Sequence, residues 1–300
     1  MISYGKYKNR MAVIVKSKTL RAVILPKDGA KIASLIAVEQ NKELLVTKDG
    51  ANYKVLTYEG SYVDSECSAF DDMCPTIDPY TPDYGENAGK AYPDHGECCR
   101  LEYEVQTEGD SVLLIAHSRL FPLTYKKKVE VKNTGITLTY EVENHGKGEF
   151  PFLWAGHVML KGEDGMRLRT PFEANDPTGM IFATAGCNQA SLPKDHLLGY
   201  EPGCGAAYKF YYLEKIKEGR FSAVYADGKE LVFVYDKEKL PYLGVWLNNG
   251  EFQNLYNIAP EPCNIPFDSP HKAKMHGYTA SIPAKGKFEI TIDILYTGEK

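Results

Sequence analysis

Long apolar runs and clustered positive charge are both missing from this 300-residue sequence. No stretch approaches the roughly 18 consecutive apolar residues of a membrane-spanning helix, and the N-terminal segment lacks the apolar core of a secretory signal. Lys and Arg total 35 against 40 Asp and Glu, and the lysines are scattered between acidic residues instead of forming a basic stripe. We therefore expect a soluble, cytoplasmic protein that binds neither a membrane nor a nucleic acid.

No CxxC pair recurs among the seven cysteines, which stand at positions 67, 74, 98, 99, 187, 204 and 263. An odd number without such pairs fits neither the disulfide framework of a secreted protein nor a structural zinc site. We expect free thiols and no bound metal.

Helical periodicity is missing as well, because no window of about 12 residues or more shows an apolar stripe with the period of about 3.6 residues. Alternation with a period of two is frequent, as in Ile136–Val142 and Phe288–Ile294. Asn133 and Gly135 mark a hairpin turn between two such runs. Further strands are predicted at Ala12–Val15, Arg21–Leu25, Val112–Ala116, Lys126–Val131, Glu230–Tyr235, Leu243–Leu247 and Gly277–Ile282.

These strands predict an all-β fold, a large antiparallel β-sandwich, because hairpins and not helical crossovers connect them. No repeat or linker divides the chain, so residues 1–300 are expected to form a single domain. Glu66–Glu97 and Glu173–Tyr200 break the strand pattern with many turn-forming residues. Long loops in a compact domain are usually functional, so we expect both to fold over a binding face.

The segment Tyr92–Arg100, YPDHGECCR, places His95 in the first of these loops. By itself it is compatible with a metal site, a nucleophile or a plain turn. The metal site is the weakest of the three, because no second histidine stands at ligand spacing and the side chains of Cys98 and Cys99 would point to opposite faces of a strand.

A second candidate is His157, three residues after Trp154 in the apolar segment Pro151–Leu160. One interpretation is a core histidine whose ring bonds to the backbone. The other is a sugar site, in which a pyranose packs its apolar face on an aromatic ring while an imidazole binds its oxygens. The residues alone leave both open.

The third candidate is Glu261, which stands between Pro260 and Pro262 after the apolar run Tyr256–Ala259. Most glutamates are solvated surface residues. Proline on both sides nevertheless fixes the backbone, which helps a catalytic carboxylate to keep its orientation. We expect this residue at a strand end.

In their order along the chain, these segments resemble the aldose 1-epimerase (galactose mutarotase) superfamily. The resemblance rests on Pro93–Gly96 after a long loop, on Asn144 followed by Trp154–His157, and on Glu261–Cys263. It extends to the closing stretch Gly277–Tyr296. It implies a galactose mutarotase-like supersandwich, a large antiparallel β-sandwich whose concave face carries the site.

The resemblance also implies roles: His157 as general acid, Glu261 as general base and His95 as a sugar-binding histidine near the ring oxygen. Arg100 is implied as a weaker sugar contact, and Trp154 is the expected aromatic platform. Anomer interconversion removes a proton from the anomeric hydroxyl and protonates the ring oxygen. With ordinary pKa values of about 4.3 and about 6.5, the glutamate would be charged and the histidine a ready proton donor near neutral pH. No metal or organic cofactor is needed.

The expected ligand is a monosaccharide or a sugar phosphate, and a homodimer is left open. His157 is followed by Val-Met-Leu, where many members of the superfamily carry a proline and aromatics, so the sugar is not identified. One alternative is a sugar-binding or regulatory protein without turnover. Another is a β-sandwich hydrolase or lyase that uses a His and a Glu on glycosidic substrates, for which Asp71-Asp72 would supply the partner carboxylate.

Overall fold

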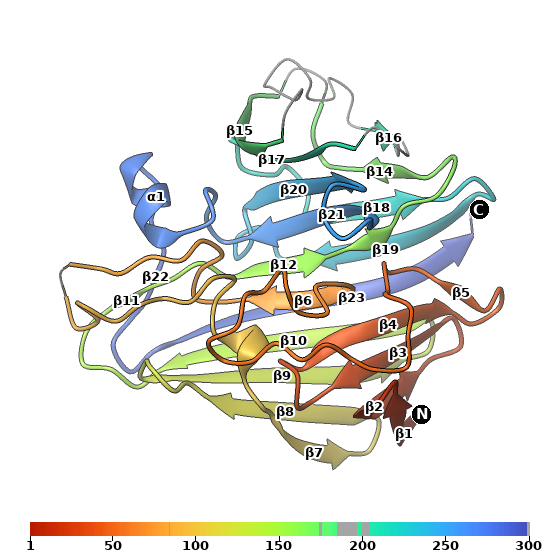
Figure 1. Ribbon diagram of the computed structural model, residues 1–300, viewed down its shortest axis with the longest axis horizontal. Coiled ribbons are helices and arrows are strands. Elements are labelled where there is room, and N and C mark those ends of the chain that lie inside the picture. Colours follow the sequence, from red (N-terminus) through yellow and green to blue (C-terminus); the bar gives the residue numbers. More distant parts are fainter. Residues whose placement is uncertain (84, 174–175, 185–196, 200–204, 299–300) are drawn as a thin grey trace.

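The structure, a computed structural model, describes residues 1–83, 85–173, 176–184, 197–199 and 205–298. These residues form two large antiparallel β-sheets (Figure 1). The first sheet has 12 strands in the described ranges. In hydrogen-bonded order they are β1 (Ile2–Tyr7), β2 (Arg10–Lys16), β3 (Leu20–Leu25), β4 (Lys31–Ala37), β6 (Phe70–Met73), β12 (Ala155–Val158), β21 (Tyr256–Cys263), β20 (Tyr242–Asn249), β17 (Ala207–Tyr212) and β15 (Thr178–Ala183), with β5 (Lys42–Glu43) paired to β4 and β13 (Leu160–Lys161) paired to β21.

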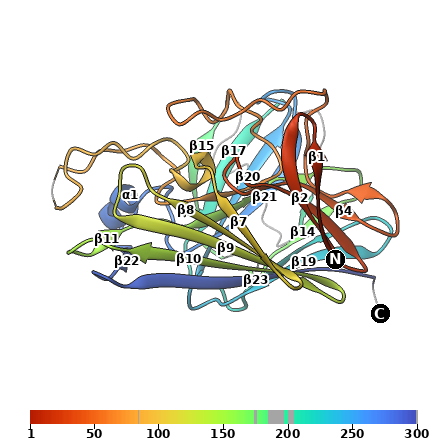
Figure 2. The same cartoon turned by 90° about the horizontal axis from the view of Figure 1, so that it is seen from below.

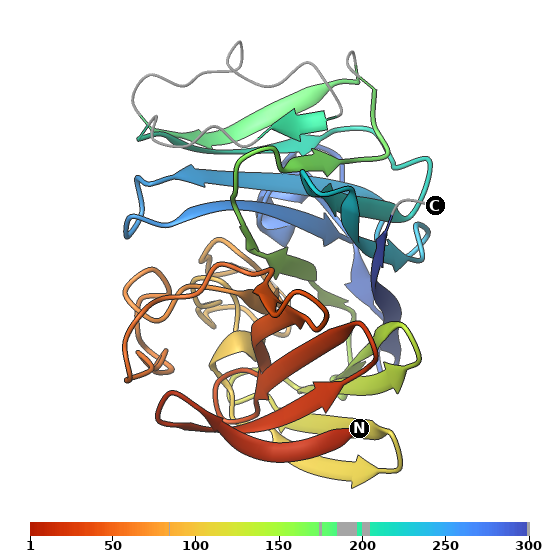
Figure 3. The same ribbon diagram turned by 90° about the vertical axis from the view of Figure 1, so that its right-hand side faces the viewer.

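The second sheet has nine strands within the described part of the chain. Their order is β16 (Leu197–Gly199), β14 (Arg167–Arg169), β18 (Arg220–Val224), β19 (Lys229–Tyr235), β23 (Lys287–Gly298), β10 (Gly135–Asn144), β9 (Leu123–Lys132), β8 (Ser111–His117) and β7 (Glu104–Glu108). A small pair joins β11 (Phe150–Pro151) to β22 (Ser281–Ile282), and the helices are the 3-10 turn η1 (Cys98–Arg100) and α1 (Pro270–Met275). Figure 2 shows β10 and β23 in one layer and β20 and β21 in the other. In Figure 3 the first sheet rises from the red N-terminal strands to the green and blue strands.

The alternating runs form strands with one face in the core between the sheets. In β10, Leu138, Tyr140 and Val142 are buried while the residues between them are partly exposed. Across the interface, the Phe70 ring of β6 meets the Phe233 ring of β19 edge to face, with centroids 6.4 Å apart. The predicted all-β antiparallel sandwich is confirmed.

The predicted strand at Gly277–Ile282 is wrong over most of its length. Only Ser281–Ile282 is a strand, because α1 precedes it and the chain then turns at Gly277 with a φ of 85°. The Ser269 hydroxyl caps α1 by accepting the N–H of Lys272, and Pro270 occupies the first turn.

The predicted loop Glu66–Glu97 contains β6, which lies in the middle of the first sheet. This four-residue strand is buried on both sides and shows no alternation, so the sequence gives no period-two signal for it. The second predicted loop, Glu173–Tyr200, includes β15 at the sheet edge, and residues 174–175, 185–196 and 200 lie outside the described residues.

The described cysteines at positions 67, 74, 98, 99 and 263 are free thiols, as expected, while Cys187 and Cys204 lie outside the described residues. In the described part of the chain, no helix has the length and apolar character needed to cross a membrane.

Candidate active site

Neighbouring strands of the 12-stranded sheet bring one row of residues together on its outer face. Register pairs Tyr211 of β17 with Gly244 of β20, and Gly244 with Glu261 of β21. The register of β12 against β21 brings His157 alongside Glu261, and His157 itself pairs with Asp71 of β6. The sheet therefore unites, on one face, residues that are far apart in the sequence.

Because side chains alternate along each strand, every second residue lies on the same outer face of the sheet as this row. In β21, Ile258 belongs to the core between the sheets, whereas Asn257 and Glu261 line a cavity on the opposite face. Glu261 was expected at a strand end, but β21 continues to Cys263, so the glutamate lies inside a central strand. Its backbone is fixed by the sheet on both sides.

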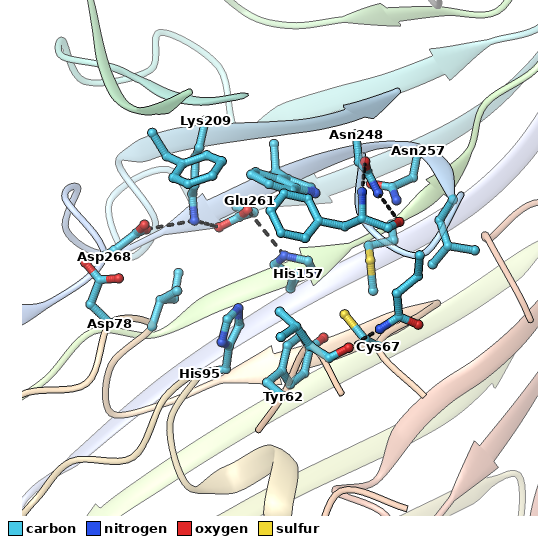
Figure 4. Close-up of a pocket in the computed structure, with 18 residues that line it drawn as sticks. Tyr62, Cys67, Asp78, His95, His157, Lys209, Asn248, Asn257, Glu261 and Asp268 are labelled. Atoms are coloured by element: carbon cyan, nitrogen blue, oxygen red, sulfur yellow. Dashed lines mark hydrogen bonds and ion pairs between the residues drawn. The ribbon is translucent and has the colours of Figure 1, made fainter. Parts of the chain in front are cut away.

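The cavity has a volume of about 280 Å³. Side chains of β12, β17, β20 and β21 form its floor, and the segments that carry Tyr62 and His95 form part of its wall (Figure 4). Its ionisable lining residues, apart from Tyr62 and Cys67, are Asp78, His95, His157, Lys209, Glu261 and Asp268.

Glu261 is fully buried, yet one of its carboxylate oxygens has no hydrogen-bond partner among the described residues. Its Oε2 accepts a hydrogen bond from Lys209 Nζ at 2.6 Å. Its Oε1 lies 3.6 Å from His157 Nε2, beyond ordinary hydrogen-bond distance (Figure 4). A buried acceptor of this kind costs free energy unless a ligand or a water molecule donates a hydrogen bond to it, so Oε1 is available to a molecule in the cavity.

Lys209 joins two carboxylates in this cavity. Its Nζ lies 2.6 Å from Glu261 and 2.7 Å from Asp268 Oδ1, and the Tyr211 hydroxyl donates to the same Asp268 oxygen at 2.5 Å. Burial alone would lower the pKa of Lys209, but the attraction of Asp268 and then of Glu261 outweighs burial and raises the pKa. Lys209 therefore stays cationic and fixes the orientation of both carboxylates.

His157 is neutral at neutral pH. Burial, followed by the positive charge of Lys209 and the proximity of His95, lowers the pKa of His157 well below its ordinary value of 6.5. The expectation of a ready imidazolium near neutral pH is therefore wrong for the free protein. The Nδ1 atom of His157 has no hydrogen-bond partner among the described side chains and backbone groups.

His95 reaches the cavity from a tight turn. Its φ is 60° and that of Gly96 is 75°, and a Cβ at Gly96 would collide with neighbouring backbone, so only glycine fits there. The His95 ring stacks on Tyr62 with centroids 4.0 Å apart and meets His157 edge-on at 6.2 Å. Its Nδ1 lies 2.9 Å from Asp94 Oδ1. The structure thus brings His95, His157 and Glu261 to one cavity.

Arg100 does not reach the cavity, which corrects its predicted place as a sugar contact. It is buried, and its guanidinium donates to backbone carbonyls of two segments that cover the sheet. The acceptors are the carbonyl oxygens of Thr57, Tyr58, Gly60, Asp94 and Gly96. Arg100 therefore holds the turn that carries His95 and contributes to the site only through that turn.

Trp154 does not line the cavity either, which corrects its predicted place as an aromatic platform. Its indole is buried in the core between the sheets and packs on Tyr140 with ring centroids 4.9 Å apart. Trp154 and His157 are an odd number of residues apart, so their side chains fall on opposite faces. The tryptophan that does line the cavity is Trp246 of β20.

Lys209 and Trp246 are two cavity-lining residues that the sequence interpretation did not select. Lys209 interrupts the aromatic run AYKFYY of β17, and a charged residue inside such a strand is a signal for a buried ion pair. Trp246 has the even spacing from Asn248 that places both on one face, and both line the cavity. This spacing was visible in the sequence.

Neither Asp71 nor Asp72 lines the cavity that holds Glu261, so neither supplies a partner carboxylate there. Asp71 contacts Lys31 at 2.9 Å and accepts the Tyr62 hydroxyl at 2.8 Å, whereas Asp72 pairs with Lys127 at 2.8 Å. Adjacent strand residues point to opposite faces, so the two carboxylates do not share one space. In the described ranges, no group of three or more His, Cys, Asp and Glu side chains is placed to hold a metal ion.

Gly244 is expected to be required for the packing of this row. A Cβ at this position would lie 2.8 Å from the buried Tyr211 ring, which is rigid and hydrogen-bonded to Asp268. Gly244→Ala is therefore expected to lower the free energy of unfolding by about 1–3 kcal/mol through overpacking. Urea unfolding of the variant checks this expectation. An unchanged urea concentration at the midpoint would show that the Tyr211 ring moves aside for the added methyl group without loss of stability.

Sequence comparison finds no family model and no curated protein that matches, but solved structures match over nearly the whole chain. The Slr1438 protein of Synechocystis sp. is 14% identical, with a TM-score of 0.70 and coverage of 98% of this chain and 99% of its own. An Escherichia coli protein provisionally named an aldose 1-epimerase is 10% identical, with a TM-score of 0.68 and full coverage of both chains. A galactose mutarotase-like protein of Clostridium acetobutylicum is 13% identical, with a TM-score of 0.66 and coverage of 100% and 99%. Agreement at such low identity is agreement in fold, and this chain has the galactose mutarotase-like fold.

Proposed function

We propose that the protein is an aldose 1-epimerase, an isomerase that interconverts the α and β anomers of a monosaccharide. The observation that carries the proposal is the unpartnered Oε1 of Glu261, which lies 3.6 Å from His157 Nε2 inside the cavity. A carboxylate and an imidazole that face one small space can exchange protons with two oxygens of a single ligand. The cavity of about 280 Å³ lies at the small end of ligand pockets, which suits one monosaccharide.

The chemistry needs one base and one acid. Glu261 Oε1 takes the proton of the anomeric hydroxyl while protonated His157 donates a proton to the ring oxygen. The bond between the anomeric carbon and the ring oxygen breaks, and the aldehyde forms. After the aldehyde rotates, the two residues return the protons in the opposite sense, and the ring closes as the other anomer.

Lys209 and His95 support this reaction from either side. Lys209 occupies Oε2 of Glu261, so that the other oxygen faces the ligand with a fixed orientation. His95 lies beside His157, and in this proposal it holds the sugar near its ring oxygen. The provisional name of the Escherichia coli protein agrees with the proposal.

Proton NMR of anomer exchange tests the proposal on a panel of free aldoses and their 6-phosphates. The expected result is faster exchange of at least one sugar than in buffer alone. Saturable sugar binding without faster exchange would instead identify a sugar-binding protein of this fold. A panel in which no sugar exchanges faster or binds would overturn the proposal.

The pH dependence of the rate follows from His157. Because its pKa is well below 6.5, the protonated form becomes rarer as pH rises through neutrality. If His157 is the acid, kcat/KM is expected to fall about tenfold per pH unit from about pH 6 to about pH 8. The measurement is the rate of anomer exchange after subtraction of the buffer rate. A flat profile over this range would assign the proton donor to another group.

A further inference from the structure

Asp71 is a buried carboxylate that lies next to the cavity without lining it. The register of β6 and β12 pairs Asp71 with His157, so both side chains point to the outer face of the 12-stranded sheet. The carboxylate accepts the Tyr62 hydroxyl at 2.8 Å and pairs with Lys31 at 2.9 Å. The reaction proposed above uses none of these three partners, Asp71, Tyr62 and Lys31.

Tyr62 connects this carboxylate to a histidine of the site. Its hydroxyl donates to Asp71, while its ring lies against His95 with centroids 4.0 Å apart and planes 12° from parallel. The same ring meets His157 edge-on, with centroids 6.2 Å apart. In Figure 4, Tyr62 and His95 lie on the same side of His157. A phenol ring whose hydroxyl is held by a buried carboxylate fixes the plane of the imidazole that stacks on it.

The backbones of the two segments that carry these rings are held separately, by Arg100. Its guanidinium donates to carbonyl oxygens before Tyr62 and around His95, which are those of Thr57, Tyr58, Gly60, Asp94 and Gly96. A fixed backbone still leaves side-chain torsions with more than one allowed rotamer. The orientation of the Tyr62 ring therefore depends in addition on the carboxylate that its hydroxyl reaches.

Lys31 keeps this carboxylate a strong acceptor. Burial alone would lower the pKa of Lys31, but the attraction of Asp71 is the largest opposing cause, and the pKa is raised. Lys31 therefore stays cationic and favours the ionised form of Asp71. An ionised carboxylate accepts a stronger hydrogen bond from a hydroxyl than a neutral group does.

We propose that Asp71 and Tyr62 are positioning residues, which fix the ring plane of His95 so that this histidine presents one constant edge to the sugar. The part that His95 plays toward the sugar rests on the proposed epimerase function. Without the carboxylate, the buried Tyr62 hydroxyl has no acceptor, which costs free energy until the hydroxyl turns toward water in the cavity. That turn takes the phenol ring off the face of His95.

Two double variants of the full chain test the proposal. The Asp71 double variant, Lys31→Met with Asp71→Val, removes the carboxylate together with its cation, so that no unpaired charge stays buried. The Asp72 double variant, Lys127→Met with Asp72→Val, is the matched control. It removes the neighbouring buried pair, 2.8 Å apart, whose lysine points into the core between the sheets.

Proton NMR of the His95 ring is the first measurement, and it requires no turnover. Stacking on Tyr62 places the imidazole over an aromatic face, so its ring protons resonate upfield of those of an exposed histidine. The signal is identified as the one that His95→Gln lacks. The Asp71 double variant is expected to lose most of the upfield shift, whereas the Asp72 double variant keeps it.

Tyr62→Phe is a second variant that keeps the buried pair of Asp71 and Lys31 and removes only the hydroxyl. The His95 signal is expected to move in the same direction as in the Asp71 double variant. A signal that stays at its wild-type position in Tyr62→Phe would show that packing alone holds the ring, and would overturn the proposal.

Kinetics give a further measurement for any sugar that the wild type converts. In the proposed function His95 binds the sugar, whereas Glu261 and His157 exchange the protons. The Asp71 double variant is therefore expected to raise KM about 10- to 100-fold and to change kcat by less than about threefold. The Asp72 double variant is expected to keep the wild-type KM.

The outcomes separate this inference from the proposed function. Suppose that the wild type exchanges anomers, but the His95 signal or KM moves no more in the Asp71 double variant than in its control. This result overturns the inference and retains the epimerase. Movement of the His95 signal in the Asp71 double variant and in Tyr62→Phe, without anomer exchange of any sugar by the wild type, supports the positioning of His95 and overturns the epimerase. Absence of both effects overturns both.

Discussion

Replacing Glu261 with glutamine is expected to lower kcat for anomer exchange by about 10²- to 10⁴-fold, the usual contribution of a positioned general base. Glutamine keeps the shape of the side chain and can still accept the hydrogen bond from Lys209, but its amide cannot take a proton from the anomeric hydroxyl. Lys209 also keeps its contact with Asp268 at 2.7 Å, so a folded variant is expected. The loss should therefore appear in kcat more than in sugar binding.

Saturation kinetics by proton NMR, with binding measured in parallel, checks this expectation. Glu289→Gln is the matched control, because Glu289 is an exposed residue of β23 that pairs with Lys287 and lies in the other sheet. The control should keep the wild-type rate. Equal rates for Glu261→Gln and the wild type would remove Glu261 from the chemistry and leave the cavity as a binding site.

The alternation of apolar and polar residues was enough to predict the fold class. Ile136–Val142 and Phe288–Ile294 lie in β10 and β23, which pair along nearly their whole lengths. Period-two patterns fix one buried face, and hairpin turns fix antiparallel order. The short central strand β6 was not predicted, because its four residues are all buried and show no alternation of buried and exposed positions.

Motif spacing was enough to select His95, His157 and Glu261, which the structure gathers in one cavity. Their grouping depends on the register of β6, β12 and β21, which a single sequence does not encode locally. Trp154 and Arg100 were misplaced for two different reasons. An odd spacing from His157 turns the indole into the core. The Arg100 guanidinium donates to five backbone carbonyls, three of which belong to residues 40 to 43 positions away in the sequence.

The charge state of His157 could not be predicted from the sequence, because it depends on burial and on Lys209, which is 52 residues away in the chain. Lys209 pairs with Trp246 in the sheet and reaches Glu261 across the position of Gly244, where no side chain intervenes. A lysine that neutralises the buried glutamate also disfavours a second cation nearby. In the proposed mechanism, Lys209 therefore couples the orientation of the base, Glu261, to the protonation of the acid, His157.

Replacing Lys209 with methionine is expected to lower the free energy of unfolding by about 3–5 kcal/mol at neutral pH, because two buried carboxylates lose their shared cation. This corresponds to a fall in melting temperature of about 5–8 °C.

Lys209→Met is also expected to change the pH profile of catalysis. The positive charge of Lys209 is, after burial, the largest cause of the lowered pKa of His157, so its removal raises that pKa. The falling limb of log kcat/KM should therefore move to higher pH, a shift that a merely structural role for Lys209 would not produce. The measurement is the rate of anomer exchange at a series of pH values.

Lys127→Met is the matched control for this shift. Lys127 is an equally buried lysine that pairs with Asp72 at 2.8 Å, but it points into the core between the sheets. Lys127→Met should lower the free energy of unfolding by a similar amount. It should leave the falling limb of log kcat/KM at its wild-type pH. If both variants lose stability and neither moves the limb, Lys209 is structural. If only Lys209→Met moves it, the lysine determines when His157 carries the proton that the ring oxygen receives.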